Sequence, residues 1–197
     1  MSRLRYGSAA VVTALAAIVF ITVLARAVLI APQEPAASAA AVPAVAAPGD
    51  YPARLRIPAL GINANVQQTG LTKSGAMGTP TNFTDVAWYK PGPVPGQAGS
   101  AVIDGHVDNG LSLAGVFKYL VDIKVGDDLY VDTKDGRALH FVVTDVETYP
   151  YHAVPTDLVF NRVDAARLNL ITCEGVWVGA DKTYDHRLVV FAELKQS

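Results

Sequence analysis

The sequence of 197 residues contains a single cysteine, Cys173. One cysteine permits no internal disulfide, so the chain is not a small domain held together by disulfides. An excess of either charge is also missing, since 16 Lys and Arg stand against 18 Asp and Glu and no basic cluster is present. A nucleic-acid partner therefore has no electrostatic basis. No internal repeat is present, and the composition, 51% hydrophobic and 17% charged, is that of a globular domain.

The N-terminal region carries an uncharged, mostly apolar stretch of 19 residues at 7–25. A helix of this length rises about 28 Å, close to the thickness of a hydrocarbon core. Arg3 and Arg5 precede it, and the positive-inside rule keeps them in the cytoplasm. We therefore predict a cytoplasmic stub and one transmembrane anchor over residues 1–30, with the rest of the chain outside the cell. The alternative is a signal peptide cleaved near 37–39, and the domain is exported in either case.

Residues 31–49 form a second region of biased composition, with nine Ala, four Pro and one charge. Such a segment is a spacer that cannot build a core. Fourteen of the sixteen aromatic residues follow it, between Tyr51 and Ser197. We therefore predict a linker over 31–50 and one folded domain over 51–197, which is long enough for a real core.

The domain consists of short segments rich in Val, Ile, Leu and Tyr that are separated by Gly and Pro. This pattern predicts an all-β sandwich or barrel. An Asp-Gly turn within 134–137 predicts an antiparallel hairpin, and apolar residues at helical spacing predict a short helix over 113–123. Loops are expected at 90–99 and 149–157. The expected strands are 53–57, 62–69, 100–105, 128–132, 139–148, 168–173 and 187–194, with a short eighth strand near Gly78.

Cys173 lies where the apolar strand LNLIT meets the segment EG. Alternation along this strand turns Asn169, Ile171 and Cys173 to the same face. A side chain at such a strand end is held rigidly yet is reached from outside. A lone cysteine is most often a buried, inert thiol. An exported chain that used cysteine for stability would carry a second one, however, so Cys173 is a candidate nucleophile.

Two other strand ends carry reactive side chains. His106 directly follows the strand segment AVIDG, and Arg187 opens the last strand. If that strand pairs antiparallel with the strand of Cys173, about 4.8 Å away, Cys173 and Arg187 are neighbours at one rim. Arginine stays charged at physiological pH and suits a role as a fixed donor to an oxyanion. His186 is a weaker alternative base, whereas His140 and His152 are expected to be structural or surface residues.

The motifs GHVD, LITCEG and HRLVVFA occur in this order behind the N-terminal hydrophobic stretch. Together they resemble the sortases, the cysteine transpeptidases of Gram-positive cell surfaces. The segments LRIPALGINANV, GAM and WYKPGPVPG resemble the actinobacterial pattern called class F. The resemblance implies a closed eight-stranded β-barrel with one or two short helices. It also implies cleavage of an LPXTG-like sorting signal between Thr and Gly through a thioacyl intermediate, and transfer to an amine on a peptidoglycan precursor or a pilin lysine.

Carried over residue by residue, the resemblance makes Cys173 the nucleophile, His106 the acid and base, and Arg187 the clamp for the oxyanion or substrate. No cofactor is expected and no metal ligand is assigned, and calcium use stays open. From reference pKa values, an uncoupled Cys–His pair holds only about 1% of molecules as thiolate and imidazolium near neutral pH. The enzyme is therefore expected to be slow unless the site shifts this balance.

The substrate-binding residues are expected around the nucleophile, at Ile171, Thr172, Glu174 and Trp177. Thr172 would line the pocket by resemblance. Glu174 stands where class F members often have Gly, and its charge is expected to raise the pKa of Cys173. The 174–185 segment is the candidate lid, in which Trp177 packs on the apolar part of the signal or on its own barrel.

Three alternatives stay open. The same residues serve a cysteine endopeptidase that only hydrolyses. Asp104, His106 and Asp108 alternate along the chain and are candidate metal ligands. The third alternative is a non-catalytic binding module of the cell envelope, carried on a stalk.

Overall fold

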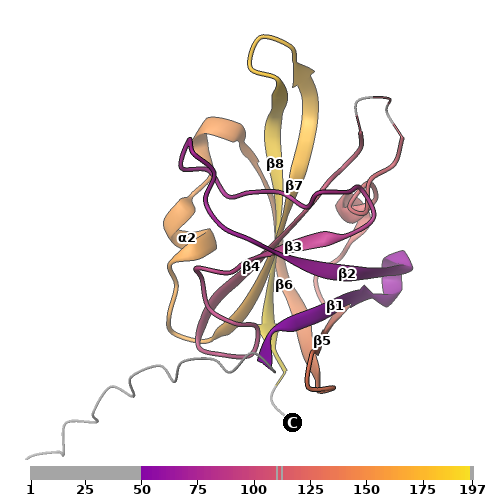
Figure 1. Ribbon diagram of the computed structural model, residues 1–197, viewed down its shortest axis with the longest axis vertical. Coiled ribbons are helices and arrows are strands. Elements are labelled where there is room, and N and C mark those ends of the chain that lie inside the picture. Colours follow the sequence, from indigo (N-terminus) through magenta and orange to yellow (C-terminus); the bar gives the residue numbers. More distant parts are fainter. Residues whose placement is uncertain (1–49, 110, 112, 196–197) are drawn as a thin grey trace, which may run out of the picture. The chain divides into compact units, whose positions relative to one another are not determined.

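The structure is a computed structural model that describes residues 50–109, 111 and 113–195. In this part of the chain, eight strands close into a barrel in the order β1-β2-β3-β4-β7-β8-β6-β5 (Figure 1). The all-β class and the closed eight-stranded barrel are thus confirmed. The strands are β1 (Pro52–Ile57), β2 (Ile62–Thr69), β3 (Val86–Tyr89), β4 (Gly99–Gly105), β5 (Asp128–Thr133), β6 (Ala138–Pro150), β7 (Ala166–Val178) and β8 (Thr183–Leu194). The helices are the 3-10 turns η2 (Pro58–Leu60), η3 (Leu120–Asp122) and η4 (Tyr151–Ala153) and the α-helix α2 (Thr156–Phe160).

Alternation along the strands separates an interior from an outer face. On β4, Ala101 and Ile103 join the main core inside the barrel, whereas Val102 belongs to a second cluster outside it. Helix α2 contributes Val159 to this outer cluster and packs against β4, beside which it lies in Figure 1. The outer face of β4, β7 and β8 is therefore a partly covered apolar surface on which the polar residues of the strand ends lie.

The strand pairing brings the candidate residues to this outer face. Strand β4 runs parallel to β7, and β7 runs antiparallel to β8. The predicted hairpin at the Asp-Gly turn is also confirmed, since β5 and β6 pair antiparallel across it. The ends of β4 and β7 consequently point the same way, and β8 begins beside the place where they end.

The predicted helix over 113–123 is wrong. Only η3 is helical there, because the preceding backbone folds against the segment that follows β4. Gly115 N–H donates to the Val107 carbonyl and Phe117 N–H to the His106 carbonyl. These donors are no longer free for bonds within a helix. The apolar spacing instead serves the core, in which the Phe117 side chain is buried.

The eighth strand also lies elsewhere than expected. It is β3, at Val86–Tyr89, and not near Gly78, where Leu71 and Met77 form only an isolated bridge. Strand β3 has four residues, of which Val86, Ala87 and Trp88 are buried. So short a run shows no alternation, because both of its faces are covered.

The expected lid over 174–185 is a β-hairpin. Strands β7 and β8 continue past Cys173 and pair through Trp177↔Tyr184 and Val178↔Thr183, with an irregularity in register between Glu174 and Trp177. The long hairpin extends beyond the barrel at the top of Figure 1. The loop expected at 149–157 is likewise partly ordered, since it contains η4 and the start of α2.

The predicted anchor at 1–30 and nearly all of the linker at 31–50 lie outside the described residues. No helix within residues 50–109, 111 and 113–195 has the length and apolarity needed to cross a membrane.

Candidate active site

Cys173 is placed on the outer face of β7. Leu168 and Leu170 point into the barrel, and Ile171 joins the outer cluster, so alternation turns Cys173 outward beside Ile171. The thiol is partly exposed. Cys173 pairs with Arg187 on β8, as the sequence predicted. The thiol of Cys173 and the guanidinium of Arg187 therefore belong to directly paired residues on two adjacent strands.

His106 reaches the other side of Cys173 through the parallel pairing of β4 and β7. The last regular pair is Asp104↔Ile171, and His106 and Cys173 each follow two residues later. The Thr172 hydroxyl donates to the Gly105 carbonyl at 2.7 Å, which extends the connection by one residue. His106, Cys173 and Arg187 thus lie on three adjacent strands or strand ends.

A glycine allows the chain to pass close behind His106. A Cβ atom at Gly115 would lie 2.2 Å from the His106 carbonyl oxygen, so only glycine fits there. The segment before β3 holds the imidazole from the other side. His106 Nε2 lies 3.0 Å from the Pro80 carbonyl oxygen, and the ring is 4.8 Å from that of Phe83. Because a carbonyl only accepts, His106 Nε2 is the donor in this bond.

Arg187 is fixed by its own hairpin and by η4. Its guanidinium donates to the carbonyls of Tyr184 and His186 at 3.0 and 2.8 Å and to the Thr183 hydroxyl at 2.7 Å. It also stacks over the Tyr151 ring at 4.3 Å. Several donors and a flat stacked face are properties that lysine lacks. Sequence inspection missed Thr183 and Tyr151, since neither has a motif and both act through Arg187.

Replacing Arg187 by lysine is expected to lower kcat/KM about 10- to 100-fold, because the charge is kept while the fork of hydrogen bonds and the stacking are lost. The measurement is turnover of a fluorogenic sorting peptide. Thr183→Val, which removes one of the three bonds, is the graded control and is expected to cost less. Wild-type turnover in Arg187→Lys would show that positive charge alone suffices.

The electrostatics at Cys173 oppose ionisation. Burial raises the pKa of the Cys173 thiol, Arg187 lowers it, and the carboxylates of Asp104 and Asp108 raise it further, for a net upward shift. The raised pKa of Cys173 therefore disfavours the thiolate form of its side chain. Glu174 is not the cause of this shift. It alternates to the opposite side of β7 and pairs with His186, which corrects the expectation from the sequence.

The segment after His106 is tied to the hairpin by a hydrogen bond that the sequence did not reveal. The Tyr184 hydroxyl donates to Asp108 Oδ2 at 2.5 Å, and this bond together with burial raises the pKa of Tyr184 to about 12. Asp108 is thus engaged on the far side of Cys173. In the part of the chain that the structure describes, no group of three or more His, Cys, Asp or Glu side chains is arranged to hold a metal ion. The metal alternative through Asp104, His106 and Asp108 has no support from this geometry.

Asp104 is a partly buried acidic residue close to Cys173, and its Oδ2 atom is fully buried. Burial raises its pKa to about 7, although Arg187 and the Gly105 backbone N–H lower it. The unfolded chain has an ordinary Asp pKa, so it releases this proton at lower pH than the folded protein does. The folded protein is therefore most stable, as far as Asp104 is concerned, below about pH 4, where this side chain is protonated in both states. Its free energy of unfolding falls as the pH rises to about 7, by at most about 4 kcal/mol.

Asp104→Asn is consequently expected to unfold at higher temperature than the wild type at pH 8 and at nearly the same temperature at pH 4. Thermal unfolding at pH 4, 6 and 8 measures the difference. Asp122→Asn, at an exposed position, is the control and should show no gain that grows with pH. An equal gain for Asp104→Asn at all three pH values would contradict the assignment of Asp104 as a buried charge.

The residues that were expected to bind substrate differ in their exposure and contacts. Ile171 lies on the outer face with Cys173. The Thr172 side chain is 1% exposed and supports the Gly105 carbonyl from inside, which differs from the expected role of lining a pocket. Trp177 is 55% exposed on the hairpin and makes an edge contact with Tyr184, so its packing on its own barrel is observed while its contact with a substrate stays a prediction.

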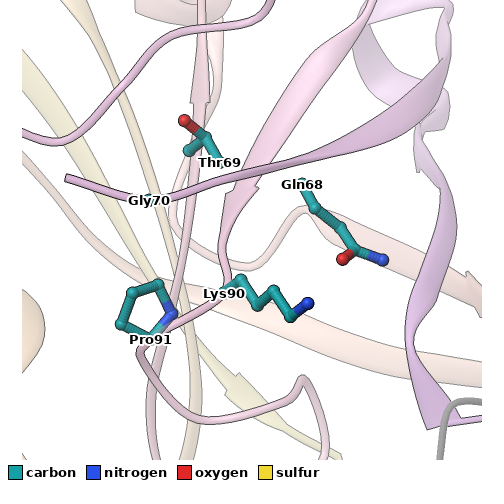
Figure 2. A pocket seen from close by; sticks show the side chains of 5 residues that line it. All are labelled: Gln68, Thr69, Gly70, Lys90 and Pro91. Atoms are coloured by element: carbon teal, nitrogen blue, oxygen red, sulfur yellow. The ribbon is translucent and has the colours of Figure 1, made fainter. Parts of the chain in front are cut away.

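Two hollows are present in the described part of the chain, and neither includes Cys173, His106 or Arg187 in its lining. One, of 560 Å³, lies between the ends of β2 and β3, and Figure 2 shows Lys90, Gln68 and Pro91 around it. The other, of 580 Å³, includes Met77, Tyr89 and Phe160 in its lining. These three residues also pack against the outer cluster that contains Ile171. The second hollow and Ile171 therefore border the same apolar cluster, while Cys173 does not line the hollow.

Comparison with known proteins identifies the family. A model of the sortase domain matches residues 55–195. The fold is similar to that of a lid mutant of sortase A from Corynebacterium diphtheriae, at 23% identity and a TM-score of 0.58 over 74% of this chain and 70% of that one. It is also similar to sortase C-1 from Actinomyces oris, at 23% identity and a TM-score of 0.56 over 73% of each chain. Sortase A from Listeria monocytogenes matches at 21% identity and a TM-score of 0.55, over 73% of this chain and 86% of that one. No curated protein matches in sequence.

The structural matches show the fold, and the domain match extends over most of the chain, including the ends of β4 and β7 and the start of β8. The chain belongs to the sortase family of cysteine transpeptidases.

Proposed function

We propose that this sortase, of the class F type, cleaves an LPXTG-like signal between Thr and Gly and transfers the threonyl acyl group to an amine on a peptidoglycan precursor or a pilin lysine. The pairing of Cys173 with Arg187, with His106 at the end of the neighbouring strand, is the observation that supports this most directly. A nucleophile, an acid and base, and a fixed cation are the groups that acyl transfer requires.

The reaction has two halves. Cys173 Sγ attacks the threonine carbonyl, the C–N bond breaks, and protonated His106 gives its proton to the departing glycine amine. The acyl group then forms a thioester with Cys173. An amine attacks this thioester and gives its proton to His106, and Sγ leaves as the new amide forms. Arg187 carries positive charge beside the thiol, where negative charge develops on the oxyanion.

The apolar part of the signal fits the outer face. Ile171 lies on the same face of β7 as Cys173, and Met77, Tyr89 and Phe160 pack against the same apolar cluster and line a hollow. Helix α2 forms one wall of this surface, and the β7–β8 hairpin rises at its other end. We assign the leucine and proline of the signal to this surface and the threonine to the rim at Cys173.

The remaining part of the proposal concerns location. The stretch at 7–25 anchors the chain in the membrane with its N-terminus inside, and the linker at 31–50 carries the catalytic domain outside. The partners are then surface proteins that bear a sorting signal and an amine acceptor at the cell wall.

The test uses the full-length chain, purified in detergent, with a quenched LPXTG peptide and a glycine-peptide amine. A thioacyl adduct on Cys173, found by mass spectrometry, and an amide product that increases with amine concentration are the expected results. Hydrolysis alone, with no amide at any amine concentration, would favour the endopeptidase. A chain that forms no adduct and releases no product would fit the binding module instead.

A further inference from the structure

Three buried side-chain atoms have no hydrogen-bond partner within the described residues, and all three lie on one face. They are Ser100 Oγ, Asp104 Oδ2 and Asn169 Oδ1. On β4, Ile103 points inward, so Ser100 and Asp104 point outward by alternation. Asn169 of β7 pairs with Val102 of β4, whose side chain also points outward. The unpaired atoms are therefore grouped on the outer face that also carries Cys173.

Asp104 differs from the other two in charge and position. Asn169 lies beneath the α2 segment, since its Nδ2 donates to the Val159 carbonyl at 2.6 Å, and the Ser100 backbone N–H donates to the Arg162 carbonyl in the same region. Asp104, in contrast, pairs with Ile171 and so lies two residues before the level of Cys173. It is the unpaired group that a substrate at the nucleophile would meet first.

A buried carboxylate oxygen without a donor is costly, and such atoms call for a specific explanation. The nearest cation does not supply the donor, because Arg187 directs its hydrogen bonds to Thr183, Tyr184 and His186. Burial raises the pKa of Asp104 even though the Gly105 backbone N–H and Arg187 lower it, and Oδ2 is the carboxylate oxygen that is left without a donor. A site in which one acceptor is kept free is suited to a ligand that brings its own donor.

The position of Asp104 limits which group of a bound substrate could donate a hydrogen bond to its Oδ2 atom. From the strand spacing, the Cα atoms of Asp104 and Cys173 are about 8 Å apart, and both side chains point to the same face. A carbonyl carbon bonded to Sγ therefore brings the side chain of its own residue within reach of Asp104. Asp108, the other carboxylate that acts on Cys173, already receives the Tyr184 hydroxyl.

We propose that Asp104 is a specificity-determining residue, whose Oδ2 accepts a hydrogen bond from the hydroxyl of the residue that Cys173 attacks. This inference rests on the proposed function, in which that residue is threonine. A hydroxyl donating to a buried carboxylate forms a charge-assisted hydrogen bond. Valine has nearly the same shape but no donor, and it would leave the carboxylate buried and unpaired.

The test is a double-mutant cycle between enzyme and peptide. The wild type and Asp104→Ala are each supplied, as full-length chains, with an LPXTG peptide and with the same peptide carrying valine in place of threonine. The rate of thioacyl formation on Cys173 is measured for all four pairs. We expect the wild type to prefer threonine about 10- to 100-fold, and Asp104→Ala to prefer it by less than about 3-fold.

The preference is a ratio within each enzyme, so it does not depend on how much of a variant is folded. Asp104→Val, which also lacks an acceptor but fills more of the space, is a second variant with the same expected ratio. Asp108→Asn is the matched control, since it removes a carboxylate that raises the same thiol pKa, and it should keep the wild-type preference for threonine.

Each result is decisive. An unchanged threonine preference in Asp104→Ala and Asp104→Val would overturn the inference, as would a loss of preference in Asp108→Asn of the same size, which would indicate a general effect of charge. A variant that alters only the dependence on amine concentration would place the carboxylate at the acceptor and also overturn it. If the wild type formed no thioacyl adduct with the threonine peptide, the proposed function itself would fail, and this outcome is distinct from all the others.

Discussion

Cys173→Ala is expected to form no covalent adduct with a sorting peptide and to lower kcat/KM by at least about 10⁴-fold, because the group that bonds to the acyl carbon is gone. The remaining residues still bind the peptide and stabilise charge, but no second thiol is present in the sequence to replace the nucleophile. Mass spectrometry of the protein after incubation with peptide, together with fluorogenic turnover, measures both parts of the effect.

The control for this variant is Ile171→Val, two residues away on the same face of β7. It changes the apolar surface by one methyl group and leaves the thiol in place, so adduct formation should persist with a modest change in KM. Turnover by Cys173→Ala at even a tenth of the wild-type rate would exclude Cys173 as the nucleophile and would return the metal or binding-module alternatives to consideration.

His106→Gln is expected to lower kcat/KM about 10²- to 10⁴-fold, because glutamine does not exchange a proton near neutral pH. Its side-chain amide can still donate to the Pro80 carbonyl, which His106 Nε2 contacts at 3.0 Å. The loss therefore reports proton transfer more than misplacement. The pH profile of kcat/KM is the measurement, and the wild type should be bell-shaped, with its alkaline limb moved upward by the raised pKa of Cys173.

His186→Gln provides the comparison, since His186 stands next to Arg187 and was the alternative base. The structure places it opposite Glu174 and beside Asp185, with which it forms an ion pair when protonated. Activity within about 3-fold of the wild type is expected for this variant. If His186→Gln lost as much activity as His106→Gln, or if His106→Gln kept the full bell-shaped profile, the assignment of the acid and base would have to be reversed.

Most strands of the barrel were predictable from the sequence, whereas the extension of β7 and β8 beyond Cys173 was not. Alternation and the Asp-Gly turn identified seven of the strands and the β5–β6 hairpin, because strand alternation and tight turns are encoded locally. The pairing of Cys173 with Arg187 was also predictable, since a chain that reverses direction between two strands forms an antiparallel pair. The residues 174–185 were misread as a loop, because pairing past Cys173 depends on cross-strand partners such as Trp177 and Tyr184.

The helix at 113–123 was also predicted wrongly because the structure of this segment depends on contacts with another segment. Its apolar residues have helical spacing, but their backbone donors are taken by the carbonyls of His106 and Val107. Spacing reports which side chains are buried, whereas the hydrogen-bond partners of the backbone depend on which segment lies alongside.

The sequence by itself identified the candidate reactive groups of this protein, Cys173, His106 and Arg187, in motifs that identify the family, although Cys173 and Arg187 lie within β7 and β8 and not at strand ends as predicted. Chemistry of this kind is carried by residue type and local position. Only the tertiary structure decided how these groups are held and what surrounds them, including the Pro80 contact of His106, the three bonds of Arg187 and the unpaired carboxylate of Asp104. Burial and the absence of a donor are properties of the packed environment, and distant segments of the chain create them.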